Sequence, residues 1–131
     1  MTEIVASFEI KRWDAEVYQE PAEGQTLSQV LVEKEFSGAV TGTSVARLLA
    51  ARSEGGQGYV ASERFEGSVD GRSGALVYQH GGIVGGGVGT SFGNVVPGCG
   101  TGELEGATGS VEFRHDENGA AVTFVLTFVG A

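Results

Sequence analysis

Two runs of alternating apolar and polar residues, on either side of a tight turn, constrain this chain more than any other feature. They occupy residues 57–69 and 72–82, and Asp70-Gly71 lies between them. Alternation of this kind is typical of a β-strand with one buried face. Asp-Gly is favoured in two-residue hairpin turns because both central residues can take a positive φ, which glycine adopts without steric cost. The segment therefore predicts a β-hairpin.

Similar short apolar segments, separated by turn residues, recur through the rest of the chain. Those predicted as further strands are residues 4–10, 27–36, 40–51, 85–96, 103–106, 109–115 and 121–129. Many short strands with closely spaced turns are typical of a sandwich or a barrel. Glycines inside strands mark bends or close backbone approaches, as at the corners of a small barrel. We expect residues 1–131 to form one all-β domain, an antiparallel barrel of about eight strands with an apolar interior.

Three places in the pattern are less regular. Trp13 interrupts the first alternation, so we expect the strand to end or bulge there. The acidic residues 14–25 are expected to form a connection, either without regular structure or with a short irregular strand around Val17–Tyr18. Residues 45–52 have a composition that also suits a short helix, but their flanking glycines favour a strand. Lys34 falls on the apolar side of its strand. A snorkelling edge lysine is the simpler interpretation there, and a functional lysine is the alternative.

Side-chain direction in the hairpin gathers three polar residues on the face that should point inward. A two-residue loop places Glu63 opposite Tyr78, whereas a four-residue loop places Glu63 opposite His80. Glu63, Tyr78 and His80 share one face in both registers, because the side chains of a strand alternate. Only a three-residue loop would separate them and bring Gln79 inside.

A carboxylate, a phenol and an imidazole inside a barrel support two interpretations. Burial would raise the pKa of Glu63 and a nearby imidazolium would lower it, so the group could perform general acid–base chemistry. The same residues could equally form a structural network, because a buried carboxylate needs hydrogen-bond partners and Tyr78 and His80 supply them.

Charge and cysteine content exclude several classes of protein. The net charge is −9 and no basic patch offsets it, so nucleic acid and anionic membrane surfaces are unlikely partners. The first ten residues lack the basic start and apolar centre of a signal peptide, and no run is long enough for a spanning helix. A single cysteine, Cys99, cannot form an internal disulfide. We expect a cytoplasmic protein without cofactor or metal, because two scattered histidines and one cysteine do not have the spacing of a zinc site.

Six segments along nearly the whole chain resemble one known family. They are Ser7–Asp14, Phe36–Gly38, Glu63–Gly67, Gly71–Gly74, Gln79–Gly81 and Val95–Leu104. The resemblance is to a bacterial domain-of-unknown-function family whose members fold as allene-oxide-cyclase-like barrels of the calycin type. Cys99 stands where that family leads us to expect serine. The resemblance implies an eight-stranded barrel with an apolar cavity and implies no assigned activity, although allene oxide cyclases are cofactor-free and similar barrels serve as cyclases.

Two functions are compatible with these observations. The first is a cofactor-independent cyclase or isomerase that holds an apolar natural-product or lipid-like substrate in a reactive fold. Glu63, His80 and Tyr78 would be its catalytic residues, and its binding wall would comprise Phe8, Trp13, Phe36, Tyr59, Phe65, Leu76, Phe92 and Phe124. The second is a non-catalytic ligand carrier, or a structural oligomer with a filled core. The expected partners are an apolar small-molecule ligand and further copies of the same chain, in a homodimer or a homotrimer.

Overall fold

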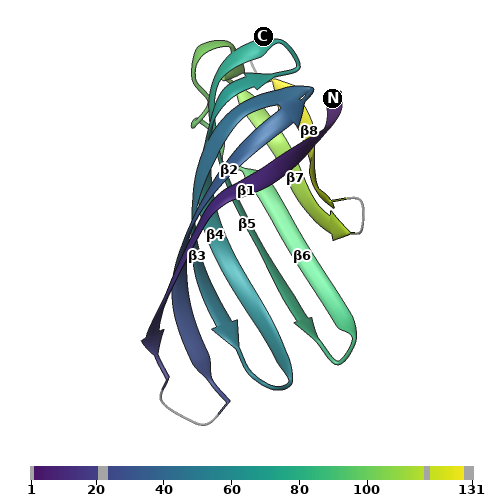
Figure 1. Ribbon diagram of the computed structural model, residues 1–131. Helices are drawn as coiled ribbons and strands as arrows, with labels where there is room; N and C mark the ends of the chain where they lie inside the picture. Colours follow the sequence, from purple (N-terminus) through teal and green to yellow (C-terminus); the bar gives the residue numbers. More distant parts are fainter. Residues whose placement is uncertain (1, 21–23, 117–118, 129–131) are drawn as a thin grey trace.

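Eight antiparallel strands close into one barrel in the computed structural model, which describes residues 2–20, 24–116 and 119–128 (Figure 1). In chain order they are β1 (Thr2–Gln19), β2 (Thr26–Gly38), β3 (Val40–Arg52), β4 (Gly56–Val69), β5 (Arg72–Gly85), β6 (Val88–Val95), β7 (Ala107–Asp116) and β8 (Gly119–Phe128). Each strand pairs with the next, and β1 pairs with β8 to complete the ring. The predicted all-β antiparallel barrel is confirmed.

Most predicted strands are present, and two predictions were wrong. Residues 45–52 belong to β3, as predicted. Residues 103–106 do not form a strand, because Gly102–Leu104 forms a short 3₁₀ helix, η1, followed by a turn. Residues 14–19 continue β1 instead of forming a connection. The last strand was predicted to reach Val129, which lies outside the described residues.

The turn at Asp70-Gly71 has the predicted two-residue form. Asp70 has φ 50° and Gly71 has φ 83°, so both central residues lie in the left-handed region. Val69 pairs with Arg72 and Glu63 pairs with Tyr78. The two-residue register is therefore correct, and the four-residue alternative, which paired Glu63 with His80, is wrong.

A β-bulge between Ile10 and Arg12 changes which residues of β1 face inward. Before the bulge the buried positions are even-numbered, for example Ala6 and Phe8. After it, Trp13 pairs with the inward-facing Val32. One extra residue in a strand shifts its alternation by one position. In the second half of β1 the bulge therefore turns the acidic residues Asp14 and Glu16 outward and brings Trp13, Ala15 and Val17 to the inner side.

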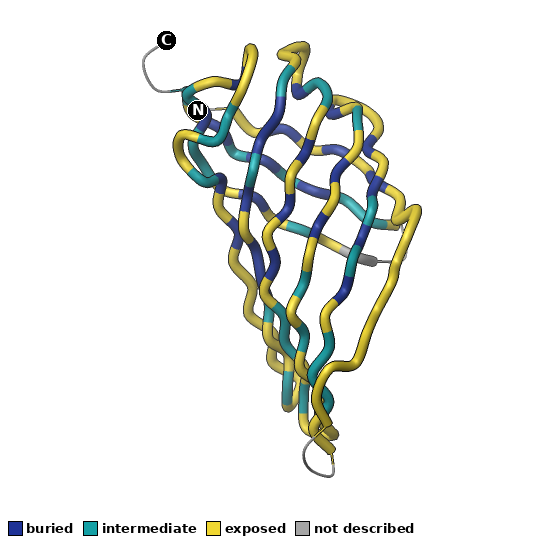
Figure 2. Tube along the Cα trace, turned by 90° about the vertical axis from the view of Figure 1, so that its left-hand side faces the viewer, coloured by how far each residue is buried: buried dark blue, intermediate teal, exposed yellow. Residues whose placement is uncertain are grey.

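The interior divides into a filled upper part and a hollow lower part. In Figure 1, β7 and β8 span only the upper part, while β1 to β6 continue downward. Figure 2 shows the buried positions gathered in the upper and middle part and the long strand ends below them mostly exposed. The largest core cluster fills the upper part with aromatic and aliphatic side chains, including Phe36, Phe65, Leu76, Tyr78 and Phe124. A cavity of about 1320 Å³ occupies the lower part.

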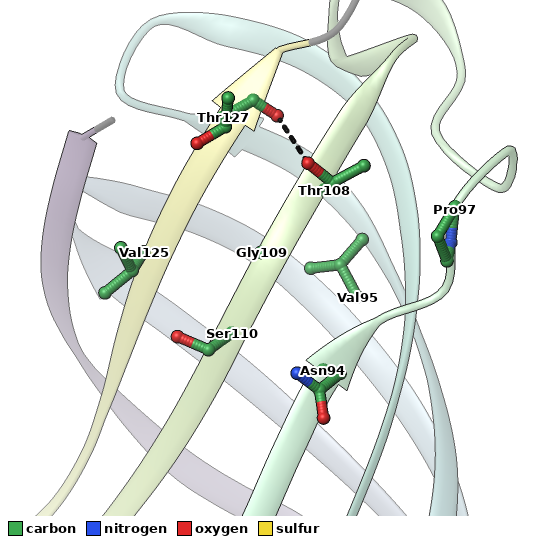
Figure 3. A pocket seen from close by; sticks show the side chains of 8 residues that line it. All are labelled: Asn94, Val95, Pro97, Thr108, Gly109, Ser110, Val125 and Thr127. Carbon is green, nitrogen blue, oxygen red and sulfur yellow. Dashed lines mark hydrogen bonds between the residues drawn. The ribbon is translucent and has the colours of Figure 1, made fainter.

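The seam between β6 and β7 is the weakest pairing of the ring. Asn94 opposite Ser110 is its one residue pair among the described residues. A shallow pocket of about 540 Å³ lies at this seam, where the Thr108 hydroxyl donates a hydrogen bond to the Thr127 carbonyl oxygen (Figure 3). The polar side chains around it are amides and hydroxyls, which are suited to ordered water more than to acid–base chemistry.

Candidate functional site

Glu63 is the centre of a buried polar network built from four neighbouring strands. Its side chain projects inward from β4, and the residue is 1% exposed. Oε2 accepts hydrogen bonds from Ser44 Oγ at 2.6 Å and from Tyr78 Oη at 2.9 Å. Oε1 accepts from Lys34 Nζ at 3.0 Å and from His80 Nε2 at 2.8 Å. Both carboxylate oxygens are thus held by two donors each.

These contacts keep the carboxyl ionised. Burial raises the pKa of Glu63, but hydrogen bonds from His80, the charge of Lys34 and the Ser44 hydroxyl together lower it more, to about 2. A carboxyl with so low a pKa is a poor proton donor near neutral pH. Glu63 therefore acts as a fixed negative charge that orients its neighbours.

Lys34 is the cation of the network, and it is enclosed by aromatic rings. Its Nζ lies 4.8 Å from the ring centre of Phe8 and 4.2 Å from that of Phe113, which are cation–π distances. Burial lowers the pKa of the Lys34 ammonium, and the Glu63 carboxylate offsets part of this effect. The prediction that Lys34 is a snorkelling edge residue was wrong, because its amine points into the barrel and is buried.

His80 links Glu63 to a second phenol, Tyr59. Its Nδ1 lies 2.9 Å from Tyr59 Oη, and its ring stacks on Phe113 with ring centres 4.4 Å apart. A carboxylate can only accept, so Nε2 donates to Glu63 and Nδ1 of the neutral imidazole accepts from Tyr59. Burial raises the pKa of Tyr59, and the Glu63 charge adds to that effect. Tyr59, His80 and Glu63 thus form a continuous chain of hydrogen bonds.

The cavity meets this network at its closed end. Tyr59, His80 and Lys34 line the cavity, together with Phe113 and Val32. Glu63 and Tyr78 lie behind them and are not part of the lining. The remaining inward side chains of the lower part are mainly apolar, such as those of Val17, Val30, Leu48 and Ala50. The site is therefore a mainly apolar space with the buried polar network at its closed end and with further polar side chains, those of Thr26, Arg52 and Gln57, at the lower strand ends.

The structure brings the three residues predicted as catalytic together but gives them different positions. Glu63 bonds to both Tyr78 and His80. Of these three, only His80 lines the cavity. Tyr78 is fully buried, and burial raises its pKa well above the usual 10. The phenol that faces both the cavity and His80 is Tyr59, which the sequence had suggested only as a wall residue.

The residues expected to form the binding wall fall into two groups. Three of them, Trp13, Tyr59 and Phe92, line the cavity. Phe92 borders the cavity only by its place on β6, because its side chain lies over Gly81 on the outward face and is exposed. The other five lie in the filled core and are absent from the lining; they are Phe8, Phe36, Phe65, Leu76 and Phe124.

Sequence reasoning missed two members of the network as site residues. Lys34 did carry a signal, since it stands on the apolar side of its strand, but nothing in the sequence connects it to Glu63. Ser44 carried no signal, because a serine among small residues is common in strands. As for metals, no cluster of three potential ligands occurs within the described ranges. Likewise, the part of the chain that the structure describes contains no helix long and apolar enough to span a membrane.

Comparison with known proteins places this barrel in a family. Residues 4–128 match the model of a family described as "protein of unknown function (DUF3224)". The chain belongs to the DUF3224 family. A crystal structure of a DUF3224 protein of unknown function from Shewanella oneidensis MR-1 is similar, with a TM-score of 0.91 and 30% sequence identity. The match covers 100% of this chain and 99% of that DUF3224 chain. A search among curated proteins found no match.

Proposed function

We propose that this barrel binds an apolar small molecule in its lower cavity and isomerises or cyclises it by proton transfer, without a cofactor. One observation carries the proposal. A hydrogen-bonded chain, from Tyr59 through His80 to Glu63, ends at the closed end of an apolar cavity of about 1320 Å³. That volume is somewhat larger than the usual range for ligand pockets, roughly 300–1,000 Å³, so it offers room for a ligand of appreciable size.

The hydrogen bonds from Tyr59 through His80 to Glu63 offer a route by which one proton can leave the substrate and return to it. When a substrate C–H next to a carbonyl gives its proton to Tyr59 Oη, the phenol proton moves to His80 Nδ1. The imidazolium that forms is stabilised by the Glu63 carboxylate on its other nitrogen. The reverse movement returns a proton to a different substrate atom, so the net result is an isomerisation with no gain or loss of protons. Because burial disfavours a free phenolate at Tyr59, His80 is needed to take the proton.

Cyclisation would use the same site and add the shape of the cavity. An apolar wall that holds a flexible substrate in a folded conformation removes part of the entropic barrier. The family that the sequence resembles is expected to fold as allene-oxide-cyclase-like barrels, and this version of the proposal draws on that analogy of fold alone.

The alternative is a non-catalytic carrier or a structural barrel. One observation favours it: within the described part of the chain, every buried side-chain nitrogen and oxygen has a hydrogen-bond partner. A fully satisfied network rigidifies a core without any chemistry. The open lower cavity favours a carrier over a structural oligomer with a filled interior.

Deuterium incorporation separates the enzyme from the carrier. The protein is incubated in heavy water with fractions of a bacterial metabolite extract, and bound and free molecules are analysed by mass spectrometry and NMR. An isomerase produces an isomer or cyclised product and leaves deuterium at carbon. Tyr59→Phe should abolish both, and Tyr18→Phe, an exposed tyrosine outside the lining, should not. Recovery of an unchanged, unlabelled ligand would support the carrier instead.

A further inference from the structure

We propose that Lys34 is an imine-forming residue, whose amine condenses with an apolar aldehyde or ketone held in the lower cavity. The inference rests on the proposed ligand-binding function of the cavity, and it names both the class of ligand and the atom that would react with it. It assigns to Lys34 a covalent role that the hydrogen-bonded chain of Tyr59, His80 and Glu63 does not need.

Lys34 is placed where a ligand would meet it. It projects inward from β2, where it pairs with Ile10 on one side and with Ser44 on the other. It lines the cavity and is only 8% exposed. The chain has just one other lysine, Lys11, which is exposed and ion-paired with Glu9. A carbonyl compound in the cavity therefore meets a single amine.

The surroundings of Lys34 suit an amine nucleophile. Burial lowers the pKa of its ammonium, which increases the share of neutral amine near neutral pH. Its Nζ and His80 Nε2 both contact Oε1 of Glu63, at 3.0 Å and 2.8 Å. The Glu63 carboxylate thus fixes the position of the amine at the closed end of the cavity. The rings of Phe8 and Phe113 flank the nitrogen and limit the access of water.

The chemistry balances with a carbonyl compound alone. The neutral amine attacks the carbonyl carbon, forming a C–N bond, and one amine proton moves to the oxygen to give a carbinolamine. Loss of the hydroxyl, with a second proton, releases one water molecule and leaves a C=N bond. Nothing is oxidised or reduced. The proton that the ammonium lost before the attack is taken up again by the imine nitrogen, so the overall change is ammonium plus carbonyl to protonated imine plus water. The protonated imine keeps one positive charge beside Glu63, where the lysine ammonium was, so the buried ion pair is retained.

Reductive trapping tests the inference directly. The intact protein is incubated with nonanal and sodium cyanoborohydride, and the alkylated lysine is located by peptide mapping. We expect labelling of Lys34 to exceed that of Lys11 by at least about tenfold, because binding holds the aldehyde beside the amine. Lys34→Arg should remove the selective label, and Lys11→Arg should keep it. If Lys34→Arg folds poorly, the ratio of label at Lys34 to label at Lys11 in the peptide map of the wild-type protein still tests the inference.

A second experiment tells failure of the imine inference apart from failure of the proposed function. It measures whether nonanal and nonanol displace a fluorescent apolar probe, N-phenyl-1-naphthylamine, from the protein. If both compounds displace the probe but Lys34 is labelled no faster than Lys11, the imine is wrong and ligand binding stands. If neither displaces it and Lys34 is not labelled, both the imine and the proposed function are wrong. Selective labelling that Ala50→Phe blocks by filling the cavity would support both.

Discussion

Tyr59 Oη and His80 Nδ1 lie 2.9 Å apart, although 21 residues separate them in the chain. Tyr59 is on β4 and His80 on β5, where they occupy neighbouring inward positions of the same hairpin. Of the two phenols in contact with this network, Tyr59 alone is accessible from the cavity, because Tyr78 is fully buried. Contact with the cavity and support of the carboxylate are therefore divided between two tyrosines.

That division predicts that two matched substitutions differ in their effects on stability and on His80. Tyr78→Phe removes a buried donor to Glu63 and should lower the free energy of unfolding by about 1 to 2 kcal/mol. Tyr59→Phe should cost less, because its hydroxyl is only partly buried, yet it should change the nitrogen-15 shift of His80 Nδ1. Urea denaturation and NMR of labelled protein check both. A larger loss of stability in Tyr59→Phe would contradict the assignment.

Glu63→Gln should be strongly destabilising. The substitution leaves Lys34 buried without its counter-charge, which typically costs about 3 to 5 kcal/mol. Glu66→Gln is the matched control, since Glu66 lies on the same strand and pairs with Arg64 at the exposed surface. Exposed pairs contribute at most about 1 kcal/mol. Similar midpoints of urea denaturation for the two variants would show that the buried pair is not stabilising.

Acid should weaken the fold through Glu63. Its pKa is about 2 in the folded protein against 4.5 in an ordinary environment. Between these values the unfolded chain binds the proton and the folded protein does not, so the free energy of unfolding falls as pH decreases through this range. The contribution is fully present above pH 4.5 and amounts to about 3 kcal/mol, since one pKa unit corresponds to about 1.4 kcal/mol. Unfolding free energies measured from pH 6 to 2 should show a steeper decline in the wild type than in Glu63→Gln.

Two glycines of β6 should respond differently to alanine. A Cβ at Gly93 would overlap the Val111 carbonyl oxygen of β7, so Gly93→Ala should lose about 1 to 3 kcal/mol of stability. A Cβ at Gly89 has its nearest neighbour 3.7 Å away, and Gly89→Ala should be neutral or slightly stabilising. Thermal denaturation of the two variants measures the difference. Equal melting temperatures would mean that β6 and β7 can separate without cost at this seam.

A row of exposed apolar side chains on the outer surface of the barrel leads us to predict self-association. Leu49, Val60 and Phe92 are more than half exposed, and register places them in one row across β3 to β6 with Gly81 between the last two. Exposed apolar groups of this kind mark interaction surfaces. We expect a dimer or trimer in sedimentation velocity, and we expect Val60→Glu to shift it to monomer while Ser62→Glu does not. A monomeric wild type at all accessible concentrations would contradict this.

The sequence predicted the features that depend on a few neighbouring residues. It did not predict the contacts that form only when the strands close into a barrel. The residue types at Asp70-Gly71 determine the geometry of the turn. The two-residue turn then sets the register, which places Glu63 opposite Tyr78. The ion pair between Lys34 and Glu63 joins β2 to β4 across β3. Since it depends on how three strands align, the residues next to either partner in the sequence do not predict it. The broken alternation at Trp13 indicated either a strand end or a bulge, and the acidic residues that follow, with Pro21 and Gly24 among them, favoured the strand end, whereas the structure has the bulge.

The filled and hollow parts of the barrel also differ in what they allow a protein engineer to change. The upper core closes the ring, so substitutions there act on folding first. Lining residues of the lower part, such as Val17 and Val84, lie away from the buried clusters and shape only the cavity. A library randomised at those positions would vary the pocket while the scaffold stays constant. One barrel could then be selected for ligands of many shapes, each presented to the same lysine, histidine and tyrosine.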